Sequence, residues 1–250
     1  MKVGIIGAMD SETGAIVHVL MEKYKSPISH YCNQNKLEFY EFNHEDVEVV
    51  ICTCGCGKVN ASLATTILIR EYKCTDIVNI GCCGTMDKSV DVGSFMIPEK
   101  AIQYDCDTTG LGEERYMVQG TDGTTTYYLS SSLRHILAVA ANSCDIDVCL
   151  FNCLAASGDT FLVSKNQKKY FGLNKINPQV VDMETAAIAH VCCILGARFA
   201  SLRQVSDSCD AKVYEETKVS TSANLSDIIL KFLELLKDYD EDNFDIGEIQ

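Results

Sequence analysis

The sequence has no apolar segment near the length of a membrane-spanning helix. Its 250 residues are 47% hydrophobic, yet no run approaches the roughly 18 apolar residues that cross a bilayer. The start, Met1 to Ile6, runs straight into a strand pattern without the cleavage site of an export signal. We therefore expect a cytoplasmic protein with no membrane partner.

Positive charge is also scarce. The chain has 21 Lys and Arg against 35 Asp and Glu, a formal net charge of -14 at pH 7. Because the basic residues are scattered, they form no segment that would attract a polyanion, and we expect no nucleic-acid partner. Much of the acidic excess lies between Asp238 and Glu248, so we expect residues 237–250 to be a frayed acidic tail.

The common fingerprints of metal and nucleotide sites are missing. Among the 14 cysteines there is no pair of C-x-x-C motifs at zinc spacing. Most of the cysteines, such as Cys52 and Cys192, lie in apolar patterns where a thiol acts as a small buried hydrophobe. The first strand turn does not fit G-x-G-x-x-G, Gly55 to Lys58 does not complete a phosphate loop, and no G-x-S-x-G elbow occurs. We expect no metal, no dinucleotide cofactor and no serine nucleophile.

What the chain does contain is an alternation of strand and helix patterns, which predicts one α/β domain over residues 1–236. Strands are predicted at 2–8, 37–42, 47–53, 75–80, 92–97, 100–104, 148–156, 180–181 and 197–205. Helices are predicted from Ser11 onward and at 58–72, 130–142, 165–171, 184–195 and about 225–236. The strands at 37–42 and 47–53 are predicted to form a hairpin. Pro98 is expected to separate the strands at 92–97 and 100–104.

Four segments allow two interpretations each. The apolar stripe from Leu225 to Leu236 fits packing on the core better than binding a partner helix. The polar loop 105–126 is predicted to be either a lid or an oligomer contact. The glycine turns at 55–57 and 81–84 indicate either close backbone approach to a ligand or tight turns alone.

Charged residues follow several predicted strands. Ligands of open α/β sheets bind beyond the carboxyl ends of the strands, so Glu12, Glu184, Arg203 and Asp207 are predicted to converge. Glu184 lies among apolar residues and must be hydrogen bonded, and the same holds for Arg203. The alternative is an internal Arg203–Glu184 ion pair without catalytic meaning. His190 reads as a core histidine rather than a ligand.

Five motifs in order make the chain resemble the 5'-methylthioadenosine/S-adenosylhomocysteine nucleosidases of the nucleoside phosphorylase superfamily. They are Gly4-Ile5-Ile6-Gly7-Ala8-Met9-x-x-Glu12, Gly55-x-Gly57-Lys58-Val59-Asn60-Ala61, Ser157-Gly158-Asp159-x-Phe161, Asp182 to Cys192, and Arg203-x-x-Ser206-Asp207. The resemblance covers about residues 1–236. It implies a single α/β domain with a central twisted mixed sheet flanked by helices, and a homodimer in which a neighbour's residues lie beside each pocket.

The resemblance also implies a reaction without metal or organic cofactor: hydrolysis of the N-glycosidic bond of a 5'-thio-substituted adenosine to adenine and a thioribose. The bond breaks with cationic character on the sugar and negative charge on the leaving purine, so an acid and an activated water are needed. By similarity, Asp207 would protonate purine N7 and Glu12 would activate the water. Glu184 would accept bonds from the ribose hydroxyls, held by Arg203. The other implied contacts are Met183 beneath the ribose, Phe161 stacked on adenine, the Leu162 backbone at its edge, Met9 at the 5'-thio group, and Ser206 beside Asp207.

The chain departs from the family pattern at several positions. Cys82 stands where a serine is usual, and Cys56 where an aliphatic residue is common. Tyr214 is expected to take the aromatic role over the 5' substituent. Residues 105–126 match poorly, so the choice between a methylthio group and a homocysteine tail stays open.

Three rival functions share parts of this pattern. One is a purine nucleoside phosphorylase, which the absence of arginines near the Gly81–Gly84 turn disfavours. Another is a nucleoside-binding protein without catalysis, disfavoured because all four charged groups are retained. The third is a nucleosidase for another adenosine derivative such as a modified futalosine, which would differ only in the 5' pocket.

Overall fold

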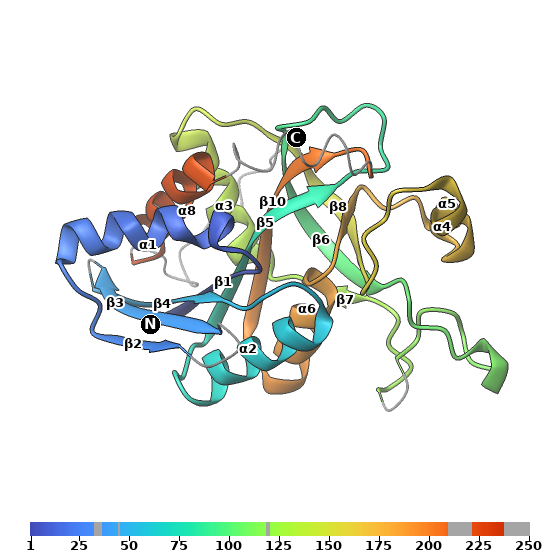
Figure 1. The fold of residues 1–250 in the computed structure, drawn as a ribbon, viewed down its shortest axis with the longest axis horizontal. Helices are drawn as coiled ribbons and strands as arrows, with labels where there is room; N and C mark the ends of the chain where they lie inside the picture. Colours follow the sequence, from blue (N-terminus) through green and yellow to red (C-terminus); the bar gives the residue numbers. More distant parts are fainter. Residues whose placement is uncertain (33–36, 45, 119–120, 210–221, 238–250) are drawn as a thin grey trace.

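The computed structural model describes residues 1–32, 37–44, 46–118, 121–209 and 222–237, which form a sheet flanked by helices (Figure 1). The strands are β1 (Lys2–Gly7), β2 (Ser29–Cys32), β3 (Glu38–His44), β4 (Val47–Thr53), β5 (Asp76–Gly84), β6 (Phe95–Gln103), β7 (Tyr127–Tyr128), β8 (Val148–Ser157), β9 (Val180–Asp182) and β10 (Arg198–Asp207). The helices are α1 (Asp10–Tyr24), α2 (Lys58–Arg70), α3 (Ser131–Ser143), α4 (Lys165–Tyr170), α5 (Leu173–Ile176), α6 (Thr185–Leu195) and α8 (Ser222–Leu236), with a short 3₁₀ turn, η1 (Thr109–Leu111).

The sheet is mixed, as predicted, and one part of it closes on itself. The strand order is β10-β6-β8-β9-β5-β1-β4-β3-β2, and β10 also pairs with β5, so that β5, β10, β6, β8 and β9 form a ring. β1 runs parallel to β4 and β5, while β9 meets β5 antiparallel through Gly84 and Val181. The ends of β5, β9 and β10 therefore meet at one place.

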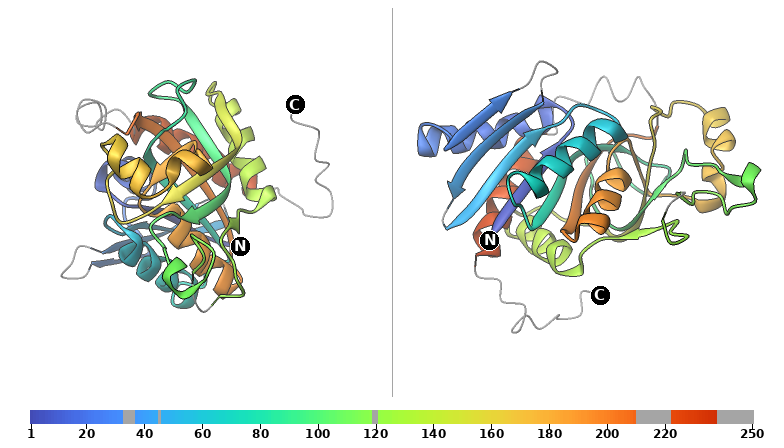
Figure 2. Two further views of the ribbon diagram at one scale, coloured as in Figure 1. Left: turned by 90° about the vertical axis from the view of Figure 1, so that its right-hand side faces the viewer. Right: turned by 90° about the horizontal axis from the view of Figure 1, so that it is seen from below.

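Two helical layers cover the two faces of the sheet. α1, α3 and α8 pack on one face, with apolar side chains such as Ile16, Leu133 and Phe232 fully or almost fully buried. α2 and α6 lie side by side on the other face (Figure 2), where Ala61, Leu68 and other small or branched residues pack. The stripe of α8 is thus confirmed as a core contact, because its six predicted positions are all buried: Leu225, Ile228, Ile229, Phe232, Leu233 and Leu236.

The sequence prediction was wrong at Pro98, which does not end a strand. β6 runs through Pro98 without a break, and its pairing with β8 shifts register between Met96 and Pro98 and again between Pro98 and Lys100. Pro98 is paired with Cys153 between these two irregularities, which is the setting in which a proline is tolerated inside a sheet. The short strands β2 and β7 were not predicted, because neither has an extended alternating pattern.

The long polar loop 105–126 contains η1 and contacts the end of α4. The Arg115 guanidinium donates to the Tyr170 carbonyl at 3.1 Å, and the Tyr116 hydroxyl donates to the Phe171 carbonyl at 3.0 Å. Its roles as lid or oligomer contact stay predictions. The expected acidic tail lies outside the described residues apart from Lys237.

None of the helices in the described ranges combines the length and the apolar character needed to cross a bilayer. Within the same ranges, no group of three or more His, Cys, Asp or Glu side chains is arranged to hold a metal ion.

Candidate active site

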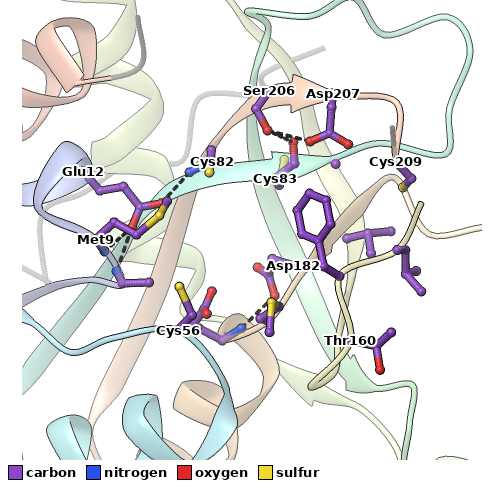
Figure 3. A pocket seen from close by; sticks show the side chains of 17 residues that line it. Met9, Glu12, Cys56, Cys82, Cys83, Thr160, Asp182, Ser206, Asp207 and Cys209 are labelled. Atoms are coloured by element: carbon purple, nitrogen blue, oxygen red, sulfur yellow. Dashed lines mark hydrogen bonds between the residues drawn. The ribbon is translucent and has the colours of Figure 1, made fainter. Parts of the chain in front are cut away.

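One cavity of about 350 Å³ lies where the carboxyl ends of β1, β5, β9 and β10 meet. Its wall contains nine of the residues that the sequence predicted for a site: Met9, Glu12, Cys82, Phe161, Leu162, Met183, Glu184, Ser206 and Asp207. Figure 3 shows Glu12 and Asp207 on either side of Cys82 and Cys83. The predicted convergence of Glu12, Glu184 and Asp207 is therefore confirmed.

Glu12 is fixed by backbone donors from two separate elements. One carboxylate oxygen accepts hydrogen bonds from the N–H groups of Ala8 and Met9 at 2.7 and 3.0 Å, and the other accepts from Cys82 N–H at 2.9 Å. The residue is 2% exposed, and it lies in the first turn of α1, where the helix dipole favours an anion. Three donors on one buried carboxylate hold it in a single orientation.

Gly81 makes this arrangement sterically possible. It has a φ of +154°, and a Cβ atom at this position would clash with the Glu12 carboxylate and lie 2.8 Å from Arg203 Nη1. The glycine turn at 81–84 therefore serves close approach to two charged side chains, not only a tight turn.

Asp207 ends β10 and is 2% exposed. The Ser206 hydroxyl lies 2.8 Å from Asp207 Oδ2 and 3.1 Å from the Cys83 carbonyl oxygen. Since a hydroxyl has one proton, it donates to one of these acceptors at a time, and either bond orients the end of the strand. The backbone carbonyl of Asp207 also accepts from Thr85 N–H at 2.9 Å, which ties β10 to the end of β5.

Arg203 lies behind the cavity wall rather than in it. Its Nη2 atom is 3.0 Å from Asp182 Oδ2 and 4.0 Å from Glu184 Oε2. The same nitrogen donates to Asn79 Oδ1 and to Thr185 Oγ1. Burial lowers the pKa of this guanidinium, but the Asp182 and Glu184 carboxylates outweigh it, so the net shift is upward.

The predicted Arg203–Glu184 pair is present at 4.0 Å, but Asp182, at 3.0 Å, is the closer partner of Arg203. Sequence reasoning quoted Asp182 within a motif but assigned it no role. The signal that would have found it is its position at the end of a buried strand, directly before the amino end of α6. There it accepts from the N–H groups of Glu184 and Thr185, each at 3.2 Å.

Glu184 is held from the other side by α2. Its Oε1 accepts from Gly57 N–H at 2.9 Å. Burial raises the pKa of this carboxyl to about 7, with Arg203 and the Gly57 N–H opposing the rise and Asp182 adding to it. Near neutral pH the group exists in both protonation states.

Other predicted residues lie at different depths. Leu162 is buried at the cavity wall, while Phe161 is 43% exposed. Cys82 lines the cavity, and burial with the Glu12 charge raises the pKa of its thiol, so it is protonated at neutral pH. Tyr214 lies outside the described residues. His190 lies outside the cavity and is half-buried, stacked on Tyr127 and bonded through Nδ1 to Gln103 at 3.2 Å, so it is only partly the core histidine that was expected.

Several lining residues were not anticipated as site residues. They are Ala8, Cys56, Cys83, Gly84, Thr160, Val181, Asp182 and Cys209. Cys83 and Cys209 are buried and Cys56 is exposed. Together with Cys82 they give the cavity a thiol-rich wall.

Comparison with known proteins identifies the family of the chain. A family model described as the phosphorylase superfamily matches residues 2–234. The chain is 33% identical over 235 residues to a 5'-methylthioadenosine/S-adenosylhomocysteine nucleosidase of Halalkalibacterium halodurans, covering 92% of this chain and 96% of that one. A nucleosidase of the same name from Exiguobacterium is 30% identical over 234 residues, with the same coverage of both chains.

Solved structures extend the similarity to the fold. A Neisseria meningitidis 5'-methylthioadenosine/S-adenosylhomocysteine nucleosidase in complex with methylthio-immucillin-A superposes with a TM-score of 0.81 at 26% identity, covering 94% of this chain and 99% of that one. The futalosine hydrolase of Helicobacter pylori gives a TM-score of 0.84 at 21% identity over 94% and 98% of the two chains.

Proposed function

The chain belongs to the phosphorylase superfamily and, within it, to the 5'-methylthioadenosine/S-adenosylhomocysteine nucleosidases, so we propose that it hydrolyses the N-glycosidic bonds of 5'-methylthioadenosine and S-adenosylhomocysteine. The products are adenine and the corresponding 5-thioribose. The observation that carries the proposal is that two buried carboxylates, Glu12 and Asp207, share one cavity of about 350 Å³. An adenine nucleoside of this kind fits a pocket of that size.

In the proposed mechanism, Asp207 donates a proton or hydrogen bond to purine N7 as the bond to the sugar breaks. Glu12 orients a water molecule and takes its proton as the oxygen attacks the anomeric carbon. The Glu12 carboxylate suits a base because its three backbone donors hold it in place without neutralising it by a cation. We assign Ser206 the role of orienting Asp207.

The sugar becomes cationic in the transition state, and the cavity has the charge to stabilise it. Glu12, Asp182, Glu184 and Asp207 line it, and none of the described lining residues is a lysine or arginine. We propose that ionised Glu184 accepts bonds from the ribose hydroxyls and that Met183 packs beneath the ring. Met9 is assigned to the 5'-thio group, and Phe161 and Leu162 to the adenine.

Hydrolysis is favoured over phosphorolysis by the same charge distribution. The N–H groups of Ala8, Met9 and Cys82 point at one place, as they would around an anion, but the Glu12 carboxylate already fills it. A phosphate ion next to this carboxylate would be repelled. Arg203, which lies behind the wall, is paired with Asp182.

An ultraviolet assay of base release tests the function. Methylthioadenosine, S-adenosylhomocysteine, adenosine, inosine and futalosine are each incubated with and without phosphate. We expect adenine from the first two in phosphate-free buffer. Strict dependence on phosphate would replace the proposal with a phosphorylase, and preferential cleavage of futalosine would replace it with the related hydrolase.

We propose further that residues 1–236 form the nucleosidase domain and that it works as a homodimer in the cytoplasm. Exposed apolar side chains on α2, such as Val59 and Leu63, lie on the same helix that binds Glu184 and support an assembly beside the cavity. Free thiols at Cys56, Cys82 and Cys209 fit a reducing compartment. Light scattering of the purified chain at micromolar concentration measures the assembly, and a monomeric mass would contradict it.

A further inference from the structure

We propose that Lys58 is a positioning residue for adenine binding, acting through a closed ring of contacts with Asp105 and Asp159. The ring holds the segment 158–163, called here the base loop, which carries the cavity residues Thr160, Phe161 and Leu162. The inference rests on the proposed function, because that function assigns the base loop to adenine.

Three contacts close the ring. The Lys58 backbone N–H donates to Asp159 Oδ1 at 2.7 Å, the Asp159 backbone N–H donates to Asp105 Oδ2 at 2.9 Å, and Asp105 Oδ1 lies 2.6 Å from Lys58 Nζ. These residues come from the start of α2, the segment after β6 and the segment after β8. The ring thus joins three elements that are distant in the chain.

The ring is continuous with the anchor of Glu184. Gly57 N–H donates to Glu184 Oε1 at 2.9 Å, and the next N–H along the chain, that of Lys58, donates to Asp159. Two successive peptide groups at the amino end of the 13-residue helix α2 therefore hold the ribose-side carboxylate and the base loop. Their spacing sets the distance between the two halves of the nucleoside site.

The side chain of Lys58 supplies the charge that this junction needs. Lys58 and Asp105 are 19% and 17% exposed at their side chains, so their ion pair is shielded from solvent more than a surface pair. Lys58 Nζ also donates to Gln103 Oε1 at 3.2 Å, and Gln103 in turn contacts His190 on α6. Without the ammonium group, Asp105 would be a poorly solvated carboxylate facing the base loop.

The base loop has a further anchor, which separates positioning from folding. The Tyr104 hydroxyl donates to the Thr160 carbonyl at 2.7 Å. Loss of the ring should therefore shift the loop rather than unfold it. Because the loop contacts the base and not the water or the sugar in the proposed mechanism, the loss should appear in substrate binding more than in the chemical step.

The test compares Lys58→Met with wild type. We expect adenine, measured by calorimetry, to bind roughly tenfold more weakly, the scale of one lost partly buried contact. KM should rise by a similar factor for methylthioadenosine and S-adenosylhomocysteine, with kcat changed less than about threefold. Lys58→Arg should restore most of the affinity. Lys73→Met is the matched control, because Lys73 bonds to Arg70 beyond the far end of α2.

A double-mutant comparison adds a stricter criterion. Asp105→Asn opens the same ring, so Lys58→Met combined with Asp105→Asn should cost no more adenine affinity than the worse single variant. If Lys58→Met does not fold, the adenine affinity of Asp105→Asn is compared with that of wild type instead. Unchanged adenine affinity, a loss confined to kcat, or fully additive losses would overturn the inference. Wild-type protein that binds adenine but cleaves neither nucleoside would instead overturn the proposed function. The adenine affinities of the variants would still test the role of the ring in that case.

Discussion

The four carboxylates of the cavity are held by different sets of hydrogen-bond donors, and this suits each of them to a different chemical role. Glu12 has three backbone N–H donors, Glu184 has one at the start of α2, and Asp182 has the Arg203 guanidinium. Asp207 has the hydroxyl of Ser206 beside it. Four acids of similar intrinsic strength thus become a base, a sugar ligand, a structural ion-pair partner and an acid in the proposed mechanism.

Replacing Asp207 by Asn tests the acid directly. The amide keeps the shape of the side chain but cannot deliver a proton, so we expect kcat to fall by roughly 10² to 10⁴. The melting temperature should stay within a few degrees of wild type. Ser206→Ala is the matched comparison and should cost far less, because it removes only the orienting hydroxyl; equal losses in the two variants would remove the distinction between their roles.

The raised pKa of Glu184 predicts a pH dependence. In the proposed mechanism the ionised form stabilises a cationic sugar, so kcat/KM should rise with pH as this group loses its proton near its pKa of about 7. Asp182→Asn removes a neighbouring negative charge and leaves Arg203 free to attract Glu184, and both changes lower the pKa of Glu184. The rising limb should therefore move to lower pH.

The measurement is kcat/KM for methylthioadenosine between pH 5 and 9. Ser206→Ala is the control, because the rise of its kcat/KM should occur at the same pH as in wild type. A limb that stays in place in Asp182→Asn would show that Glu184 does not control it. Thermal unfolding of Asp182→Asn at each pH keeps loss of fold separate from loss of rate.

The junction of β5 with α1 shows how two elements create the site together. Glu12 comes from the first turn of α1, but one of its three donors and the glycine that makes room for it come from β5. Neither element alone holds the carboxylate in place.

Gly81→Ala should break this junction. The added methyl group would clash with the Glu12 carboxylate and crowd Arg203 at a backbone φ that L-residues avoid. We expect a cost of at least about 2 kcal/mol in the free energy of unfolding and a loss of most activity. Gly14→Ala on α1 is the control: apart from its chain neighbours and the backbone of its own helix, no described atom lies within 4 Å of the added Cβ, so it should stabilise the helix by about 0.5 to 1 kcal/mol at normal activity. Urea unfolding of both variants measures the difference.

The molecule as a whole is held by the helical layer opposite α2 and α6. α8 packs across α1 and α3, and its Phe232 is fully buried. This layer supports α1, which carries Glu12, although α8 contributes no residue to the described cavity wall.

Phe232→Ala should therefore lower stability without changing the chemistry. Removing a buried phenyl ring costs about 3 to 5 kcal/mol, so the melting temperature should drop strongly. At low temperature, where the variant is folded, kcat and KM should match wild type. Altered KM at that temperature would mean that α8 shapes the cavity, contrary to this expectation.

Sequence patterns were enough to predict most of the elements and the group of acids at the strand ends. Strand and helix periods are local properties, so β1, β4, α2 and α8 were located within a few residues. Pro98 was misjudged because whether a proline breaks a strand depends on the register of the neighbouring strand. Asp182, the closer partner of Arg203, was missed for a related reason: it lies only two residues from Glu184, and sequence spacing does not show which of the two acids comes nearer to the guanidinium.

By itself, the sequence determined which residue types stand at the end of each strand, and hence the chemistry available: carboxylates, one buried guanidinium and glycines at the turns. Only the tertiary structure decided which of them touch. The closure of β5, β10, β6, β8 and β9 into a ring sets Arg203 against Asp182, and the packing of α2 brings Lys58 to Asp105 and Asp159. These contacts join residues tens of positions apart, and their geometry depends on strand register and helix packing, which no local pattern encodes.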